Sequence, residues 1–210
     1  MSTDDSHLTE QPTGQSTVLH RGFLELRRDT VRLPDGSQAT REYIRHSGAV
    51  AVVALLDGGR VVLVRQHRHP VAKVLLELPA GKLDVGESQL ACAQRELREE
   101  TGYTASEWAF GGEIHNAAAY SSESIWIWFA RGLQGGPTQL DAGEFVETVA
   151  LHLDELQTLA DGDGLPDVKT QIGLQWLARW QAGARVLHWQ SAPAPAPEPT
   201  PTPAPAPAPL

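Results

Sequence analysis

Cysteine and long apolar runs are both scarce in this sequence of 210 residues. A single cysteine, Cys92, cannot form an internal disulfide, so a secreted fold held together by disulfides is excluded. The longest apolar run, residues 49–56, is far too short to cross a bilayer, and the N-terminus lacks a signal-peptide pattern. We therefore expect a soluble protein of a reducing compartment, the cytoplasm, with no membrane partner.

Positive charge is scarce as well, with 17 lysines and arginines against 26 acidic residues and a net charge of −9. Binding to a nucleic-acid backbone needs a basic surface, so this balance argues against a nucleic-acid partner. An acidic protein can still bind a small phosphate ester when a metal ion supplies the positive charge.

The chain length indicates one main domain with polar ends. Residues 1–17 are polar and predict a disordered N-terminus. Residues 191–210 alternate proline with other small residues, which predicts a disordered Pro/Ala-rich tail. We expect a folded domain at residues 18–190, with its N-terminal strands at residues 18–46.

Hydrophobic periodicity predicts a mixed α/β fold. Strands are expected at residues 23–32 and 38–45, 49–56 and 60–67, and 113–115 and 124–130. Helices are expected at residues 88–101, 154–159 and 168–180. The first helix has a buried stripe of small and apolar residues and is stopped by Gly102.

The end of this helix reads RELREETG, with three glutamates in eight residues. Glu96 and Glu100 lie one turn apart with Glu99 beside them, at the edge of the buried stripe. Like charges so placed repel one another unless something compensates them. Three interpretations follow from these residues alone: a solvated helix face, an ion-pair network, or a site for a hard metal ion.

Together with residues upstream, this motif resembles the Nudix hydrolase signature at every fixed position. The matching residues are Gly81, Glu87, Arg95-Glu96-Leu97, Glu99-Glu100 and Gly102. The resemblance implies an α/β/α sandwich with a mixed β-sheet and N-terminal antiparallel strands. We expect Gly81 to allow a sharp turn and bring its backbone close to a metal.

The same resemblance implies a Mg²⁺ site, in which Mn²⁺ would be a substitute. The implied ligands are Glu96, Glu100 and the backbone carbonyl of Ala80. Glu99 would assist both the metal and catalysis, and Arg95 would orient the glutamates. A purely structural ion-pair network between loop and helix remains the alternative for Arg95, Glu87 and Glu99.

Outside this signature, residues 64–71, 76–84, 143–147 and 167–170 resemble the ADP-ribose pyrophosphatase branch of the family. Arg65 and Arg68 would contact the diphosphate or ribose, because guanidinium groups match phosphate oxygens. Glu77 and Glu123 would touch substrate or metal. Exposed strand-edge charge is the alternative for the two arginines.

The resemblance also implies a general base in the segment at residues 143–147. Glu144 is the first choice for this role and Glu147 the reserve. The alternative is that both are ordinary charges of a loop and a strand edge.

In this branch the N-terminal strands cross to a second subunit, which implies a homodimer with exchanged strands. Arg41 and Tyr43 would then reach the partner's nucleotide site, where the aromatic ring can stack on a base. Ordinary sheet surface is the alternative for both residues.

One loop departs from the branch. Residues 115–123 read HNAAAYSSE, with alanines where the branch carries a proline that pre-sets the turn. We predict Mg²⁺-dependent hydrolysis of ADP-ribose or an ADP-sugar to AMP and a sugar phosphate. The alternatives are a hydrolase of another nucleotide, such as GDP-mannose, a dinucleotide or an oxidised nucleotide, and a non-catalytic nucleotide-binding module.

Overall fold

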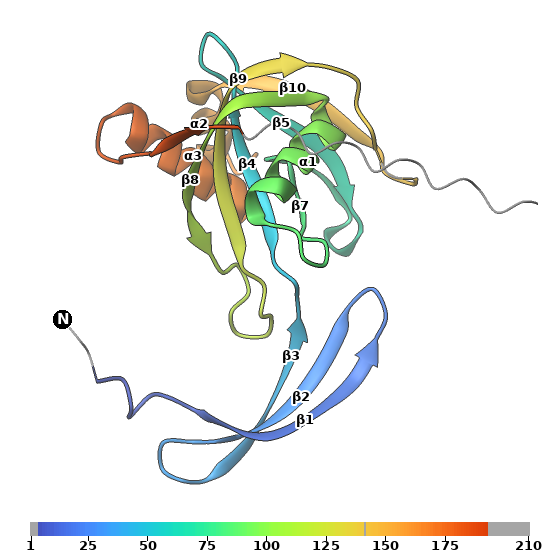
Figure 1. The fold of residues 1–210 in the computed structure, drawn as a ribbon, viewed down its shortest axis with the longest axis vertical. Helices are drawn as coiled ribbons and strands as arrows, with labels where there is room; N and C mark the ends of the chain where they lie inside the picture. Colours follow the sequence, from blue (N-terminus) through green and yellow to red (C-terminus); the bar gives the residue numbers. More distant parts are fainter. Residues whose placement is uncertain (1–3, 141, 193–210) are drawn as a thin grey trace, which may run out of the picture.

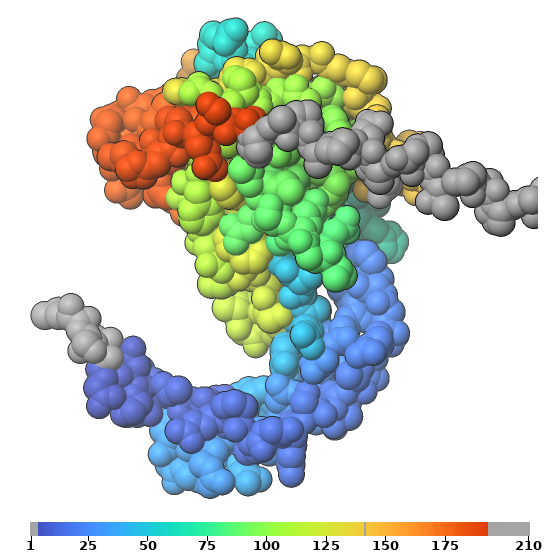
Figure 2. Space-filling view, viewed as in Figure 1, coloured from blue at the N-terminus to red at the C-terminus, as the bar shows by residue number. Residues whose placement is uncertain are grey.

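The computed structural model describes residues 4–140 and 142–192, which form a small N-terminal sheet and a larger mixed α/β body (Figure 1). The space-filling view shows the N-terminal sheet curving away from the body, which it joins through its last strand (Figure 2). The expected α/β fold with N-terminal antiparallel strands is confirmed.

The N-terminal sheet contains β1 (Gln11–Arg21), β2 (Glu25–Arg32) and β3 (Gln38–Arg45), all antiparallel. We expected disorder up to residue 17, but residues 11–17 belong to β1 and pair with β2. Most of β1 is exposed, and two irregularities interrupt its register, so no regular apolar alternation marks it as a strand.

The body contains one mixed sheet. Its strands are β4 (Ala49–Leu55), β5 (Arg60–Arg68), β6 (Lys73–Glu77), β7 (Ala80–Lys82), β8 (Tyr103–Ile114), β9 (Ile125–Gly135), β10 (Val146–His152) and β11 (Trp189–Ser191). The main order is β10-β5-β4-β9-β8-β11, with β6 beside β5 and β7 beside β4. Only the β4–β9 pair is parallel among these described pairings.

Both faces of the central strand β4 are buried, which is why its sequence is apolar throughout. Val50 and Val52 pack with the cluster that includes α1, whereas Ala51 and Val53 pack with the cluster that includes α2 and α3. The predicted alternation of β9 is confirmed: Ile127 packs on the side of α2 and α3, and Trp128 packs on the side of α1.

The helices are α1 (Gln89–Thr101), α2 (Leu153–Asp161) and α3 (Val168–Gln181), and a short 3₁₀ helix, η1 (His69–Val71), follows β5. The hydroxyl of Ser88 accepts the Ala91 N–H and so caps α1 at its start. Gly102 ends this helix in the left-handed conformation with φ 74°. No helix within residues 4–140 and 142–192 is long and apolar enough to span a membrane.

Helix α3 lies directly against β4 and against Leu78, the residue after β6, at Gly173. A Cβ atom built there would meet Leu78 Cδ1 at 2.6 Å and Val53 Cγ2 at 3.1 Å. This close approach explains a glycine inside a helix, where it is otherwise unfavourable.

Two sequence boundaries differ from the fold. The strand expected at residues 113–115 is the end of the much longer β8, and short strands β6, β7 and β11 were not predicted. Ser191, expected in the tail, pairs with Glu107 in β11. The rest of the predicted tail, residues 193–210, lies outside the described residues.

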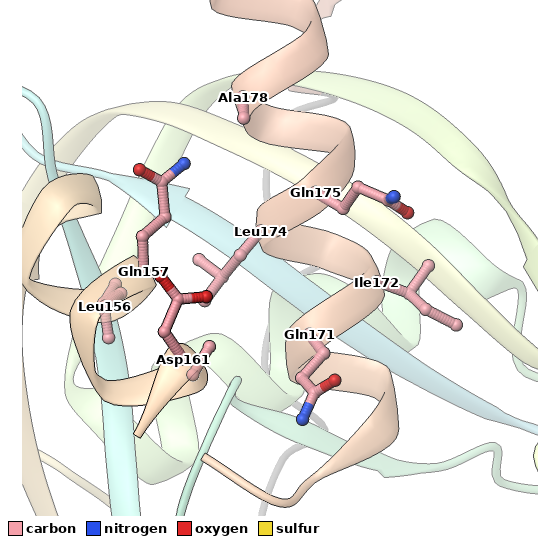
Figure 3. Close-up of a pocket in the computed structure, with 9 residues that line it drawn as sticks. Leu156, Gln157, Asp161, Gln171, Ile172, Leu174, Gln175 and Ala178 are labelled. Carbon is pink, nitrogen blue, oxygen red and sulfur yellow. The ribbon is translucent and has the colours of Figure 1, made fainter. Parts of the chain in front are cut away.

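A groove between α2 and α3 is lined by apolar and amide side chains, including Leu156, Gln157, Gln171 and Leu174 (Figure 3). Asp161 is its one charged lining residue among those described. This groove therefore lacks the charged groups that phosphate or metal chemistry requires.

Candidate active site

The carboxylates of α1 lie against β7, at the edge of the buried core. Glu100 is 7% exposed, and its Oε2 accepts the backbone N–H of Ala80 at 3.0 Å. Burial raises the pKa of Glu100 to about 8, and the negative charge of Glu96 adds to this effect. Burial likewise raises the pKa of Glu96. The pair therefore favours a neutralising proton or an external cation.

Gly81 makes room for one of these carboxylates. A Cβ atom at Gly81 would lie 1.8 Å from Oε1 of Glu96. Gly81 belongs to β7 and is absent from the glycines with positive φ, so the expected sharp turn at this position is wrong. The close approach of its backbone to the carboxylate is what requires glycine.

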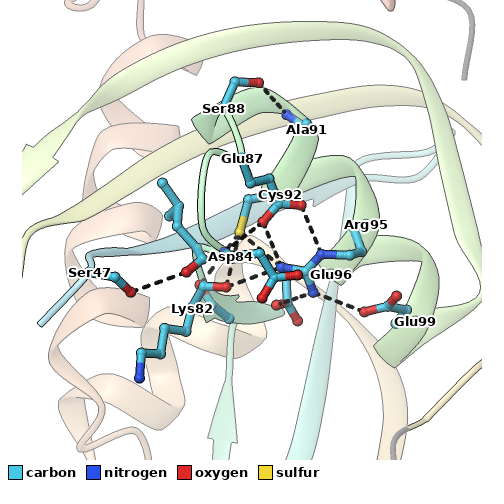
Figure 4. Close-up of polar contacts among 12 residues, drawn as sticks. Ser47, Lys82, Asp84, Glu87, Ser88, Ala91, Cys92, Arg95, Glu96 and Glu99 are labelled. Atoms are coloured by element: carbon cyan, nitrogen blue, oxygen red, sulfur yellow. Dashed lines mark hydrogen bonds and ion pairs between the residues drawn. The ribbon is translucent and has the colours of Figure 1, made fainter. Parts of the chain in front are cut away.

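Arg95 connects the acidic residues of the signature (Figure 4). Its Nε and Nη2 each donate to Glu87 at 2.9 Å, and Nη1 donates to Glu96 at 2.7 Å and to Glu99 at 3.0 Å. Nη2 also donates to the carbonyl of Lys82 at 3.1 Å, which ties α1 to the preceding loop. These contacts form an ion-pair network, and the orienting role of Arg95 toward metal ligands stays a prediction.

Arg95 also holds two of the expected metal-site carboxylates in ion pairs. Within residues 4–140 and 142–192, no three acidic, histidine or cysteine side chains already stand in a metal-binding arrangement. Even so, the donor set suits a hard divalent cation: the Glu96 carboxylate lies beside Gly81, and the buried Glu100 carboxylate lies beside Ala80, whose neutral backbone N–H it accepts.

A pocket adjoins these carboxylates and is built from β4, β5, β6, β7 and the start of α3. Arg68, Glu77, Ala80 and Glu123, all expected in the site, line it. Arg68 donates from Nε and Nη2 to the two oxygens of Glu77, both at 2.8 Å. The charge of Arg68 also acts on Glu100, where it lowers the pKa against the dominant effect of burial.

Glu77 bonds to protein cations in this structure, and its expected contact with substrate or metal stays a prediction. This side chain is 1% exposed, and its oxygens accept bonds from Arg68 and from Lys169. Two protein cations therefore occupy a carboxylate that we expected to touch substrate or metal. The sequence motif suggested a place in the site but not the partner, because Lys169 lies 92 residues further along the chain.

Glu123 lies at another part of the pocket wall with His46, whose Nε2 is 3.6 Å from Glu123 Oε1. The N–H of Gly48 donates to Nδ1 of His46 at 3.0 Å, so a neutral ring carries its proton on Nε2. The loop at residues 115–123 is bonded to β3: Ile44 N–H donates to Tyr120 O, and Ser122 N–H donates to Ile44 O, each at 2.9 Å. Backbone bonds thus shape this loop without a proline.

Arg65 faces a different groove from Arg68. The two residues are three apart on β5, and side chains of a strand alternate between faces, so they point in opposite directions. Arg65 Nη1 pairs with Glu147 Oε2 at 2.6 Å across β5 and β10, and both line the neighbouring groove with Glu144. Arg68 and Arg65 thus line two different grooves, and contact of either arginine with the diphosphate or ribose stays a prediction.

Glu144 stands on the segment before β10, and its negative charge is among the causes that raise the pKa of Glu96 and Glu100, after burial. Arg41 and Tyr43 lie on β3, away from the pocket. Arg41 pairs with Glu10, and the hydroxyl of Tyr43 donates to Asp29 at 3.0 Å. Their contact with a partner subunit stays a prediction.

Sequence reasoning assigned no individual role to three pocket residues, Phe23, Asp167 and Lys169. Phe23, between β1 and β2, is 89% exposed, lines the pocket and lies with its ring 5.4 Å from Lys82 Nζ. Asp167 and Lys169 line the pocket from α3, and the DVKT motif was the available signal. Nothing in the sequence marks Phe23.

Family models and relatives match most of this chain. The NUDIX domain model matches residues 45–169, and the model of the nucleoside diphosphate sugar hydrolase N-terminal domain matches residues 11–44. The chain is 36% identical over 178 residues to the methanol dehydrogenase activator of Bacillus methanolicus, covering 83% of this chain and 96% of that protein. It is 33% identical over 172 residues to the ADP-ribose pyrophosphatase of Bacillus subtilis, covering 81% and 93%.

A shorter match, 47% identical over 124 residues, is to the ADP-ribose pyrophosphatase of Mycobacterium tuberculosis, covering 58% of this chain and 60% of that protein. The crystal structure of an ADP compounds hydrolase has a TM-score of 0.73 at 23% identity, covering 82% of this chain and 95% of that one, which is a similarity of fold. The NUDIX model spans more than half of the sequence and includes every residue of the acidic signature. The chain therefore belongs to the family of Nudix hydrolases.

Proposed function

We propose that this protein hydrolyses the diphosphate of ADP-ribose or an ADP-sugar with Mg²⁺, giving AMP and a sugar phosphate. Nudix hydrolases generally depend on a divalent metal ion. The observation that carries the proposal is the juxtaposition of two carboxylates of raised pKa, buried Glu100 and half-buried Glu96, with the guanidinium of Arg68. The relatives named ADP-ribose pyrophosphatase support the choice of substrate.

We assign the metal to Glu96, Glu100 and the carbonyl of Ala80, with Glu99 assisting. When bound, the metal ion polarises the diphosphate and makes a water molecule more acidic. Arg95 would restrain Glu96 and Glu99 through its bonds to both side chains. Mn²⁺, which accepts the same oxygen ligands, would substitute for Mg²⁺.

We assign Glu144 as the general base that accepts the proton of the attacking water. Its negative charge contributes to the raised pKa of both Glu96 and Glu100. Glu147 stays the reserve, although Arg65 already occupies one of its carboxylate oxygens. Water attacks phosphorus, the P–O bond to the leaving phosphate breaks, and that phosphate departs as the second product. Arg68 opposes the negative charge that develops on oxygen.

The remaining pocket residues suit the two ends of the substrate. Phe23 offers an exposed ring on which a base can stack. Glu123 and the Nε2–H of His46 offer an acceptor and a donor for sugar hydroxyls. Both assignments follow from the lining of a single pocket.

We further propose a homodimer that exchanges its N-terminal strands, with Arg41 and Tyr43 directed at the partner's nucleotide site. The N-terminal sheet exposes Val18, Leu19 and Leu24, which a second subunit would bury. A cytoplasmic location suits a chain with one buried thiol, Cys92. Light scattering at micromolar concentration tests the dimer, and a monomeric mass would contradict it.

A substrate panel tests the proposed reaction. ADP-ribose, ADP-glucose, GDP-mannose, a diadenosine polyphosphate and a flavin dinucleotide are incubated with and without Mg²⁺, and the nucleotide products are separated. We expect Mg²⁺-dependent AMP from ADP-ribose. Turnover of another member alone would move the substrate to that nucleotide, and no turnover would favour a non-catalytic binding module.

A further inference from the structure

Glu77, at the end of β6, is a buried carboxylate between two cations. Its oxygens accept two bonds from Arg68, at 2.8 Å each, and one from Lys169 Nζ, at 2.5 Å. Lys169 Nζ also donates to Asp167 Oδ1 at 3.0 Å. Burial alone would raise the pKa of Glu77, but the bonds from Arg68 and Lys169 outweigh burial and hold the pKa below its ordinary value.

The same residues are joined through the backbone into a closed ring. Asp167 caps α3, and its Oδ2 accepts both the N–H and the hydroxyl of Thr170, at 3.0 and 2.5 Å. The Thr170 hydroxyl oxygen in turn accepts the N–H of Leu78 at 2.8 Å. Since Leu78 follows Glu77 in the chain, the start of α3 bonds to two successive residues at the end of β6: Lys169 to Glu77, and Thr170 to Leu78.

The ring determines which edge of Arg68 is available to a ligand. A guanidinium has five N–H groups, and Glu77 takes one from Nε and one from Nη2. The Nη1 amino group and the second Nη2 N–H remain after these bonds, and the side chain is 41% exposed. This outer edge has the spacing that matches two oxygens of a phosphate.

We propose that Lys169 and Asp167, acting through Glu77, are positioning residues that orient Arg68 for a diphosphate. They do not touch the substrate themselves, because Lys169 is 8% exposed and its amino group is engaged with two carboxylates. The inference rests on the proposed function for the identity of the diphosphate. It gives the DVKT motif a role in the site, and it makes α3 part of the binding apparatus.

Lys169 is needed because Glu77 otherwise has Arg68 as its only cation. Without Lys169, Arg68 alone must compensate a buried carboxylate, and a guanidinium drawn toward Glu77 loses its alignment with the pocket. A misaligned guanidinium group weakens diphosphate binding more than it slows the chemical step. Substitution of Lys169 is therefore expected to weaken diphosphate binding only when Arg68 is present.

A double-mutant cycle on the full chain tests this coupling. Imidodiphosphate, a diphosphate that resists hydrolysis, is titrated with Mg²⁺ into wild type, Lys169→Met, Arg68→Ala and the double variant. We expect Lys169→Met to weaken binding about tenfold to a hundredfold, the range for residues that support a site indirectly. On the Arg68→Ala background, Lys169→Met should have no further effect. Glu107→Gln, which breaks an exposed pair with Arg131, is the matched control and should bind like wild type.

Folding of each variant is checked by thermal melting. Asp167→Asn serves as the second variant, because the amide oxygen still caps α3 while one charge beside Lys169 is lost. It should give a smaller loss of affinity that also vanishes on the Arg68→Ala background. Additive losses, or unchanged affinity in folded Lys169→Met or Asp167→Asn, would overturn the proposal.

The cycle separates this proposal from the proposed reaction. Coupled losses in a protein that leaves ADP-ribose intact would support the positioning role and refute the substrate. Additive losses in a protein that cleaves ADP-ribose would support the substrate and refute the positioning role. Wild type that fails to bind imidodiphosphate at all would refute the diphosphate role of Arg68 and, with it, the inference.

Discussion

Glu77 and Glu100 are both buried glutamates under the influence of Arg68, with exposed fractions of 1% and 7%. Two cations bond to Glu77, and its pKa falls. A single backbone N–H bonds to Glu100, and its pKa rises to about 8. The more buried residue is the more acidic one, so internal partners and not burial decide the charge. Glu77 has its counter-ions inside the protein, whereas Glu100 is suited to one from outside.

The largest expected effect comes from deleting the uncompensated charge. Glu100→Gln removes an assigned metal ligand, and we expect kcat/KM for the Mg²⁺-dependent reaction to fall by more than about a hundredfold. Stability at pH 7.5 should stay level or rise, because an unfavourably buried carboxylate is gone. Steady-state kinetics and urea unfolding measure the two. Wild-type turnover in this variant would refute the ligand assignment.

The same substitution at Glu77 should have the opposite effect on stability. Glu77→Gln leaves Lys169 buried with one fewer counter-ion, and breaking a buried ion pair typically costs about 3 kcal/mol or more. Urea unfolding measures the change against Glu107→Gln, the exposed control, which we expect to lie within about 1 kcal/mol of wild type. Equal stability of Glu77→Gln and wild type would contradict the claim that internal ion pairs stabilise the charge of Glu77.

Substitutions at Gly81 and Gly173 compare the effect of site geometry on turnover with the effect of core packing on stability. A methyl group at Gly81 would collide with the carboxylate of Glu96, whose flexible end can move, so Gly81→Ala should lower turnover about tenfold with little loss of stability. At Gly173 the collision is with Leu78 and Val53 in the core, so Gly173→Ala should destabilise by about 1–2 kcal/mol. Kinetics and thermal melting on both variants measure the contrast. The reverse pattern would show that Gly81 serves the fold.

A further expected effect is a pH dependence of stability in the absence of metal. The folded-state pKa of Glu100, about 8, lies above its ordinary value of 4.5, so the folded protein binds more protons between these values. Without metal, this residue's contribution to stability is present below about pH 4.5 and is lost as the pH rises through 8. Melting temperatures in EDTA should therefore fall more steeply over this window in wild type than in Glu100→Gln. Parallel curves would contradict the raised pKa.

The sequence predicted well what depends on near neighbours. Ser88 and Gly102 mark the ends of α1, and the alternating apolar residues of β9 mark its two buried faces. The acidic signature is equally local, and its members do meet around Arg95. The roles assigned to these residues stay predictions until variants are measured.

Long-range pairing was beyond the sequence. Lys169 meets Glu77 across 92 positions, and no local pattern specifies such a contact. Strand β1 was missed because its exposed, irregular register shows no apolar alternation. Arg65 and Arg68 were grouped by motif, although the period of two in a strand already placed them on opposite faces.

The central claim, that Glu100 is buried to receive a cation from outside, is tested most directly by titrating Mg²⁺ into the protein at pH 7 in buffers of different ionisation heat. Because the carboxyl of Glu100 is largely protonated there, metal binding should release protons, and Glu100→Gln should bind Mg²⁺ more weakly and lack that release. Mg²⁺ binding of equal affinity in both proteins, with no proton released from wild type, would contradict the claim.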